Sequence, residues 1–174
     1  NQGELEGSYS INLGTTALRN ILTKDIAPNT PLEDAFKKSD QMLKERMVAF
    51  TKNMSSTMQT SEDSFCVSVG SAINHATGKK KNAAQHDSIL SYSQIAEKID
   101  DLTSKLLERF STVGDLQRWE QQMSGDVIDD MLTLRMGLPM YLLLMEKFRI
   151  KQIHVCGTGL WYGIYLQHLF NVAD

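Results

Sequence analysis

The sequence predicts an α/β domain in which several helices pack on a small sheet. Three short segments, at positions 7–13, 65–69 and 151–155, carry the alternating or continuous apolar patterns of β-strands. Each of them runs through a glycine into a segment with helical periodicity. The resulting order, β-α-α-β-α-α-α-β-α, is typical of a sheet that is covered by helices.

The first predicted strand, at 7–13, alternates apolar and polar residues as a half-buried strand does. Gly14 then turns the chain into a short helix. We expect that helix to end before Pro28, because a proline ring disfavours helix at the preceding residue. The apolar face of this helix consists of Leu18, Ile21 and Leu22.

The next helix has a clearly marked start. Thr30 is a suitable N-cap, Pro31 suits the first helical position, and Glu33 completes a capping box. Apolar positions then recur at spacings of three, four or seven, with one polar interruption at Ser39. The stripe that we expect to face the core consists of Leu32, Ala35, Phe36, Leu43, Met47, Phe50 and Met54.

The middle of the chain repeats the order of strand, glycine and helix. The residues FCVSV at 65–69 predict a buried strand, and GSAINHATG at 70–78 predicts a turn and a short helix. The polar segment 78–87 predicts a loop that closes where Ser91 and Gln94 form a capping box. The helix after this box has an apolar stripe of Ile95, Ile99, Leu102, Leu106 and Phe110.

One strongly helical segment, at 126–148, dominates the last third of the chain. It contains Gly137 and Pro139, which predict a break or a sharp kink. The apolar run Met140–Met145 must then be buried almost all round. Three further elements complete the prediction: a short helix at 115–122, a strand at 151–155 and a helix at 160–170.

Composition and charge argue against several classes of partner. The 174 residues carry a net charge of −3 and a pI near 5.8, so the chain has no basic field for nucleic acid or an anionic membrane. The two cysteines form neither a zinc signature nor a disulfide framework, which favours a cytoplasmic location. No apolar run is long enough to span a bilayer, and no signal peptide is visible. The start at Asn1 suggests a piece of a longer protein.

Three stretches resemble a known family in their order and spacing: SINLGTTALRN at 10–20, FCVSVGSAIN at 65–74, and LTLRMGLPMYLLLMEKFRIKQIHVCGTGLWYGIYL at 132–166. Together they are similar to the second domain of the exopolyphosphatase and guanosine pentaphosphate phosphohydrolase (Ppx/GppA) family. The corresponding family pieces are S-L-P-L-G-A-V-R, a strand ending in G-S-G-G-T or G-T-S-G-T, an arginine with a proline-glycine helix start, and S-D-G-A-L-R-E-G. The resemblance covers essentially the whole chain, so we expect residues 1–174 to be a single domain.

The resemblance implies a ribonuclease-H-like fold of the actin and sugar-kinase superfamily, with a phosphate cleft between two similar domains. Such enzymes release the terminal phosphate of polyphosphate or guanosine pentaphosphate with magnesium and water, and they often form homodimers. The glutamate base and both phosphate loops of the family would precede Asn1. We therefore expect this chain alone to be inactive and to bind no magnesium itself.

The second stretch suggests a phosphate contact at Gly70 and Ser71, since backbone N–H groups at a helix start can bind an anion. Here Ala72 and Ile73 replace the second glycine and the threonine of the family pattern. The alternative is that this turn only joins a strand to a helix.

The third stretch suggests a similar contact at Gly157 and Thr158. In this chain Cys156 stands where the family has aspartate, and Trp161 and Tyr162 stand where it has arginine and glutamate. The turn is therefore either an anion contact or a structural corner whose surroundings have become apolar.

Two further residues have competing interpretations. Arg135 stands where the family has an arginine on a long helix, so it is a candidate phosphate ligand. The alternative is an ion pair on the helix surface with Asp129, Asp130 or Glu146. The Cys156 thiol is either a nucleophile that has a histidine nearby on the same strand face or, as we prefer, a buried and inert thiol.

These observations support three functions, in order of preference. The first is a phosphohydrolase of this family, in which the chain supplies one wall of the polyphosphate or nucleotide cleft. The second is a non-catalytic relative that binds a phosphorylated ligand or a protein partner, which the altered turns favour. The third is thiol chemistry at Cys156.

Overall fold

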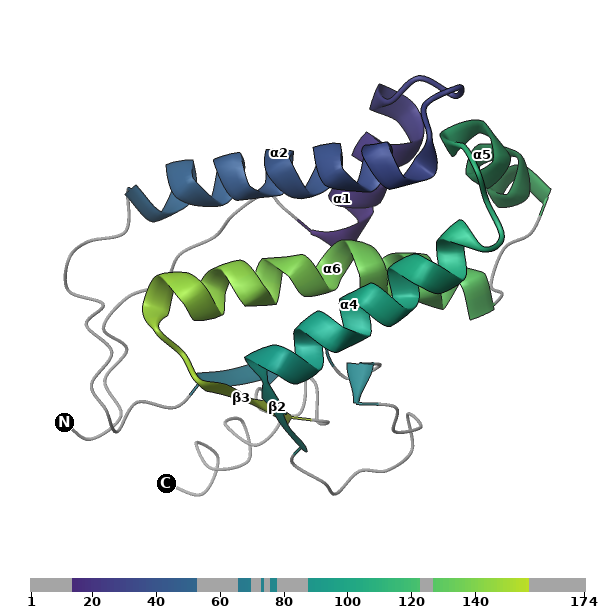
Figure 1. Cartoon of the computed structure of the whole chain (residues 1–174). Coiled ribbons are helices and arrows are strands. Elements are labelled where there is room, and N and C mark those ends of the chain that lie inside the picture. Colours follow the sequence, from purple (N-terminus) through teal and green to yellow (C-terminus); the bar gives the residue numbers. More distant parts are fainter. Residues whose placement is uncertain are drawn as a thin grey trace, which may run out of the picture.

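The computed structural model describes residues 14–52, 66–69, 73, 76–77, 88–122 and 127–156 (Figure 1). The predicted strand at 7–13 and the predicted helix at 160–170 lie outside these residues. The described elements are α1 (Thr15–Asn20), the π-helical turn η1 (Ile21–Asp25), α2 (Leu32–Lys52), β1 (Cys66–Val69), β2 (Ser88–Ser91), α4 (Tyr92–Leu107), α5 (Val113–Gln122), α6 (Val127–Phe148) and β3 (Gln152–Cys156).

The three described strands form one mixed sheet in the order β1-β3-β2. β1 runs parallel to β3, and β2 runs antiparallel to it. The sequence predicted no strand at Ser88–Ser91, so that part of the prediction was wrong. The four residues SILS are too short to show a periodic pattern, and their strand conformation depends on pairing with β3, more than 60 residues later.

Helices cover one face of this sheet, and Figure 1 shows α4 and α6 on the same side of it. Ile153 and Val155 on β3 point to that side and are buried. On the opposite face, His154 lies in register with Val67 and Ile89, which are 52% and 47% exposed. The prediction of a fully buried strand at 65–69 was therefore wrong for Val67.

Two hydrophobic clusters form the core, and α6 contributes to both. The first lies among α1, η1, α2, the end of α4, α5 and α6. It confirms the predicted stripe of α2 from Leu32 to Met47, with Phe50 partly buried, whereas Met54 lies outside the described residues. Ser39, the polar interruption of that stripe, is buried with it. The second lies between the sheet and α4 and α6, and it consists of Ile73, Ile95, Ile99, Leu102, Leu134, Leu138, Met145, Ile153 and Val155.

The helix α6 continues without a break through Gly137 and Pro139, so the predicted break was wrong (Figure 1). Both residues are buried. Proline costs the helix one backbone hydrogen bond, but packing of the helix against its neighbours routinely overrides such local preferences. α6 therefore crosses the whole domain and leads directly into β3.

The two predicted capping boxes differ in outcome. At α4, the Gln94 N–H donates to Ser91 Oγ over 3.3 Å and the Ser91 N–H donates to Gln94 Oε1 over 2.9 Å, which confirms that box. The box predicted for Thr30 and Glu33 was wrong. Pro31 instead forms a β-bridge with Thr112, and the Glu33 carboxylate lies 2.7 Å from the Lys37 ammonium.

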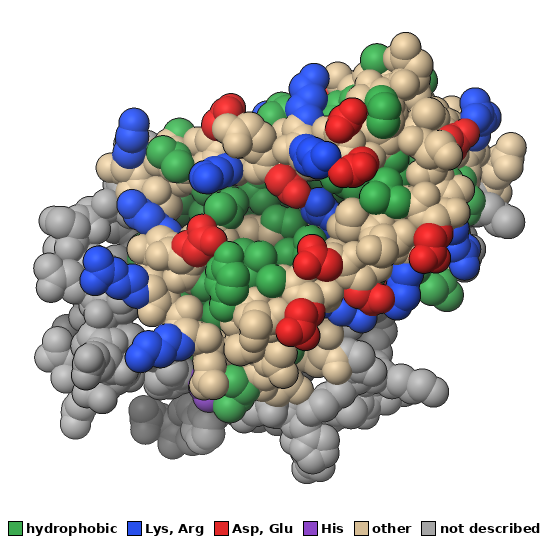
Figure 2. All heavy atoms as spheres, viewed as in Figure 1, with side chains coloured by type: hydrophobic (Ala, Val, Ile, Leu, Met, Phe, Trp, Pro, Cys, Tyr) green, Lys and Arg blue, Asp and Glu red, His purple; other side chains and the backbone are tan. Residues whose placement is uncertain are grey.

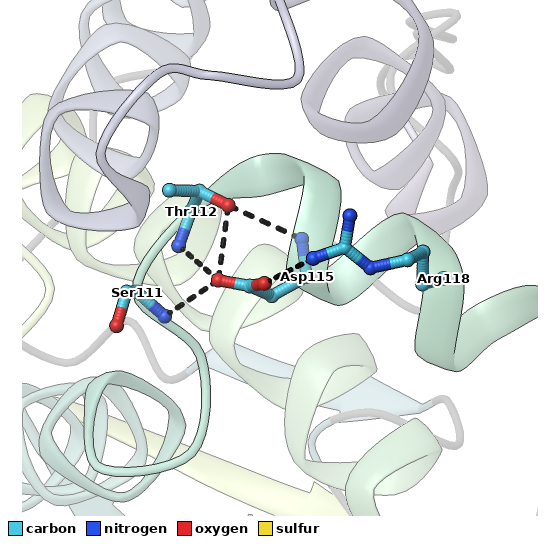
Figure 3. Close-up of polar contacts among 4 residues, drawn as sticks. All are labelled: Ser111, Thr112, Asp115 and Arg118. Carbon is cyan, nitrogen blue, oxygen red and sulfur yellow. Dashed lines mark hydrogen bonds and ion pairs between the residues drawn. The ribbon is translucent and has the colours of Figure 1, made fainter.

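The start of α5 is fixed by Asp115 (Figure 3). Its Oδ2 accepts hydrogen bonds from the Thr112 N–H and hydroxyl, both at 2.9 Å, and from the Ser111 N–H at 3.2 Å. The Asp115 N–H donates back to Thr112 Oγ1. These bonds, the backbone N–H of Thr112 first, hold the pKa of Asp115 below its ordinary value of 3.8.

This cap makes a prediction about pH. Because the folded-state pKa of Asp115 is depressed, its carboxylate stabilises the fold above about pH 4, and that contribution is lost as the pH falls through the folded-state value. We expect Asp115→Asn to unfold more easily in urea near neutral pH and to lose less stability than the wild type on acidification. Asp100→Asn, at an exposed position on α4, is the control and should match the wild-type profile.

Close packing at Gly114 makes a second prediction. A Cβ at this position would lie 3.0 Å from the Pro28 carbonyl oxygen and 3.2 Å from Pro28 Cβ, while the Gly114 N–H donates to the same oxygen over 2.7 Å. We expect Gly114→Ala to lower the free energy of unfolding in urea by about 1–3 kcal/mol. Gly14→Ser adds a Cβ where nothing lies within 4 Å and should change it by less than about 0.5 kcal/mol. Equal effects of the two variants would contradict this account.

Candidate functional site

The sheet places the ends of two strands side by side. β1 and β3 are parallel neighbours, and their last residues, Val69 and Cys156, are direct partners. The chain therefore leaves both strands at the same edge, from backbones about 4.8 Å apart. Gly70 and Gly157 are the next residues. In open α/β sheets, ligands bind outside this carboxyl edge of the strands.

The candidate phosphate contacts at Gly70, Ser71, Gly157 and Thr158 lie outside the described residues, so their role stays a prediction. What the structure adds is the common edge from which both turns depart. The sequence could not supply this neighbourhood, because the pairing of β1 with β3 joins segments more than 80 residues apart.

Ile73 lies three residues beyond Gly70, in the segment after β1. It is fully buried and belongs to the hydrophobic cluster between the sheet and α4 and α6. This residue replaces a small polar residue of the family pattern. The Ile73 side chain therefore belongs to the core and does not line an open site.

A side-chain hydrogen bond attaches β1 to α6. The buried Ser68 hydroxyl donates to Tyr141 Oη over 3.1 Å. Ser68 lies one residue before the end of β1, and its neighbour in register is the buried Val155. This bond holds the end of β1 against α6.

The two cysteines lie on adjacent strands and are not joined by a disulfide. Burial raises the pKa of the Cys66 thiol, which makes a reactive thiolate at this position less accessible. Cys156 and His154 are two residues apart on β3 and point to the same face of the sheet, as the strand period requires. The hypothesis of thiol chemistry at Cys156 stays a prediction.

Arg135 lies in the interior, with 4% of its surface exposed. Its Nη1 and Nη2 donate to the two carboxylate oxygens of Asp40 on α2, over 3.0 and 2.7 Å. Its Nε donates to Thr103 Oγ1 on α4 over 2.6 Å, and its guanidinium lies 4.6 Å from the ring centroid of Phe36. Arg135 therefore joins three helices at one point.

The predicted surface pair of Arg135 with Asp129, Asp130 or Glu146 was wrong. Asp129 instead pairs with Arg19, and Glu146 accepts a hydrogen bond from the Tyr92 hydroxyl over 2.6 Å. The true partner, Asp40, is 95 residues away in the chain, so no helical spacing could indicate it. A phosphate that bound Arg135 would have to compete with this carboxylate, which favours a structural role.

Metal-binding groups are absent from the part of the chain that the structure describes: no three His, Cys, Asp or Glu side chains there lie close enough together to hold an ion. Of the described helices, none has the length and apolar character needed to cross a membrane.

The fold is similar to that of Ppx/GppA structures. The crystal structure of the Aquifex aeolicus member of the Ppx/GppA protein family matches with a TM-score of 0.62 and 17% identity, over 95% of this chain and 49% of that chain. The type II variant of the Aquifex aeolicus Ppx/GppA phosphatase matches with a TM-score of 0.58 and 17% identity, over 91% and 48%. A further structure of the Aquifex aeolicus PPX-GPPA enzyme gives 0.54 and 16%, over 88% and 46%.

The chain thus spans about half the length of the structures that it matches. No protein-family model and no curated protein matches the sequence. The resemblance to the Ppx/GppA family is therefore confirmed at the level of the fold, which is an α/β fold with a small mixed sheet and several helices.

The environment of Arg135 makes a prediction about stability. Asp40→Asn would leave the buried guanidinium without its carboxylate, and we expect it to lower the free energy of unfolding by about 2 kcal/mol. Asp34→Asn removes an exposed carboxylate from the same helix, 3.9 Å from Lys37, and should cost less than about 0.5 kcal/mol. Urea denaturation measures both, and a cost for Asp40→Asn no larger than that for Asp34→Asn would show that the buried pair is dispensable.

Proposed function

We propose that this chain forms one wall of the phosphate cleft in a phosphohydrolase related to the Ppx/GppA family. The observation that carries the proposal is the parallel pairing of β1 with β3, because the carboxyl ends of the two strands lie at one edge of the sheet and Gly70 and Gly157 follow them in the chain. The shared fold supports it. The same proposal includes a ribonuclease-H-like architecture, in which this chain is the second of two domains, and a cytoplasmic location.

The chemistry of the edge suits a terminal phosphate. Phosphoryl transfer depends on positioning the group and on neutralising its charge, and glycine lets backbone N–H groups come close to phosphate oxygens. Gly70, Ser71, Gly157 and Thr158 are the residues that we assign to these contacts. Polyphosphate and guanosine pentaphosphate are the substrates that the family resemblance suggests.

The glutamate base and the magnesium ligands are assigned to another part of the protein. The described residues contain no group of three His, Cys, Asp or Glu side chains that could hold an ion, and we derive no catalytic step through magnesium. The chain on its own is therefore expected to release no phosphate, even where the whole protein does.

One observation favours a second function, a non-catalytic relative that binds a phosphorylated ligand or a protein partner. Ile73 lies in the core at a position where the family pattern has a small polar residue. A turn that has lost one glycine can still present the N–H groups of Gly70 and Ser71. With one glycine fewer, the backbone of the turn can come close to a phosphate at fewer positions. This matters more for hydrolysis than for binding, because hydrolysis requires a precisely positioned substrate.

The deciding measurement is phosphate release by the full-length protein from long-chain polyphosphate and, separately, from guanosine pentaphosphate. We expect release in the presence of magnesium and none after chelation with EDTA. Binding of either compound without release, by a protein shown to be folded, would favour the non-catalytic relative. If the folded protein neither releases phosphate from these compounds nor binds them, both proposals are wrong.

A substitution tests the proposed phosphate contact at Ser71. Ser71→Ala removes a hydroxyl from the first turn, and we expect the KM for the cleaved substrate to rise about tenfold or less, the cost of one hydrogen bond to a charged group. Ser104→Ala, at an exposed position on α4, is the matched control. If both variants behave as the wild type, the Ser71 side chain takes no part in binding.

A further inference from the structure

A second surface, independent of the strand edge, lies between α2 and α6. The two helices border a groove of about 230 Å³ whose apolar lining includes Met47, Val48 and Leu143. Lys44 and Lys147 stand at its rim. Figure 2, seen from the same side as Figure 1, shows hydrophobic side chains in the hollow beside α2 with charged side chains around it.

The groove exists because α6 is less covered than its sequence predicts. The run Met140–Met145 was expected to be buried almost all round, but only Met145 is fully buried and the five residues before it are half-buried. Val48, on the facing side of α2, is 49% exposed. Apolar surface of this kind on two neighbouring helices is stabilised when a further element covers it.

The charges at the rim are unequal. Among the described residues, neither Lys44 nor Lys147 has a carboxylate within ion-pair distance. The remaining charged residue of the lining, Glu146, already accepts the short hydrogen bond from the Tyr92 hydroxyl. The groove lining therefore carries two lysines and one glutamate, so it offers an occupant a positive excess of one charge.

The size of the groove favours a helix over a small molecule. Its volume of about 230 Å³ is below the roughly 300–1,000 Å³ of typical small-molecule sites. Its lining runs from Lys44 to Thr51, two turns along α2. A helix that docks in a groove inserts a few apolar side chains at spacings of three, four and seven, which matches this shape.

We propose that the groove between α2 and α6 binds an acidic amphipathic helix of a partner protein. The apolar face of that helix lies on Val48 and Leu143. Its flanking carboxylates pair with Lys44 and Lys147. This contact leaves the strand edge open, so it does not depend on the proposed phosphate site.

The test uses a fluorescein-labelled synthetic helix of about 15 residues that carries leucines on one face and glutamates beside them. A second peptide has lysine in place of every glutamate. We expect the acidic peptide to bind about tenfold more tightly by fluorescence anisotropy, and to lose affinity as salt is raised. The double variant Lys44→Glu, Lys147→Glu should weaken its binding about tenfold or more.

Two matched controls separate the groove from general surface effects. Lys24→Glu reverses an exposed lysine on η1, and Val127→Asp places a charge at an exposed valine at the start of α6. Neither should alter binding, whereas Val48→Asp should abolish it. Circular dichroism and urea unfolding of each variant establish that a loss of peptide binding does not result from unfolding.

Three outcomes would overturn the proposal. The first is equal binding of the acidic and basic peptides. The second is unchanged binding by folded Val48→Asp. The third is concentration-dependent dimerisation in analytical ultracentrifugation that Val48→Asp removes and the peptide does not inhibit, which would identify a second copy of this chain as the occupant.

Discussion

The buried guanidinium of Arg135 is the interaction on which the arrangement of the helices depends. A charge in the interior is tolerated only when hydrogen bonds and an opposite charge replace its water. Here Asp40 on α2 and Thr103 on α4 meet that requirement, and the ring of Phe36 covers one face of the group. The requirement is geometric, so it fixes the positions of α2 and α4 relative to α6.

Because α6 leads directly into β3, the position of this helix sets that of the sheet. The helix ends at Phe148. The next residue, Arg149, has a φ of 53° in the left-handed region, and the Ile150 N–H closes the end by donating to the Met145 carbonyl. β3 begins at Gln152, two residues after Ile150. At the other strand, the hydrogen bond from Ser68 to Tyr141 holds β1 on the same helix. Both strands are thus tied to α6, β3 through the chain itself and β1 through this side-chain bond.

Local signals in the sequence identified most of the helices, and non-local contacts explain the features that they missed. The Ser91 and Gln94 box and the α2 stripe depend only on neighbours in the chain, and both were confirmed. β2 and the partner of Arg135 depend on residues far away in the sequence, so no spacing could reveal them. For the site, the sequence predicted two glycine turns, and only the sheet order shows that the strands before them end side by side. The family resemblance placed Arg135 near phosphate, whereas its surroundings are those of a helix junction.

The contacts that organise this domain also constrain how the chain can acquire its structure. Arg135 and Asp40 are 95 residues apart, and Ser68 and Tyr141 are 73 apart. Such pairs form only after long loops have closed, and the entropy of closing those loops is lost before the contacts can offset it. Neither half of the chain contains both partners of either pair. The helices and the sheet are therefore expected to form together in one cooperative step, with folding slower than that of a simple helical bundle of the same length.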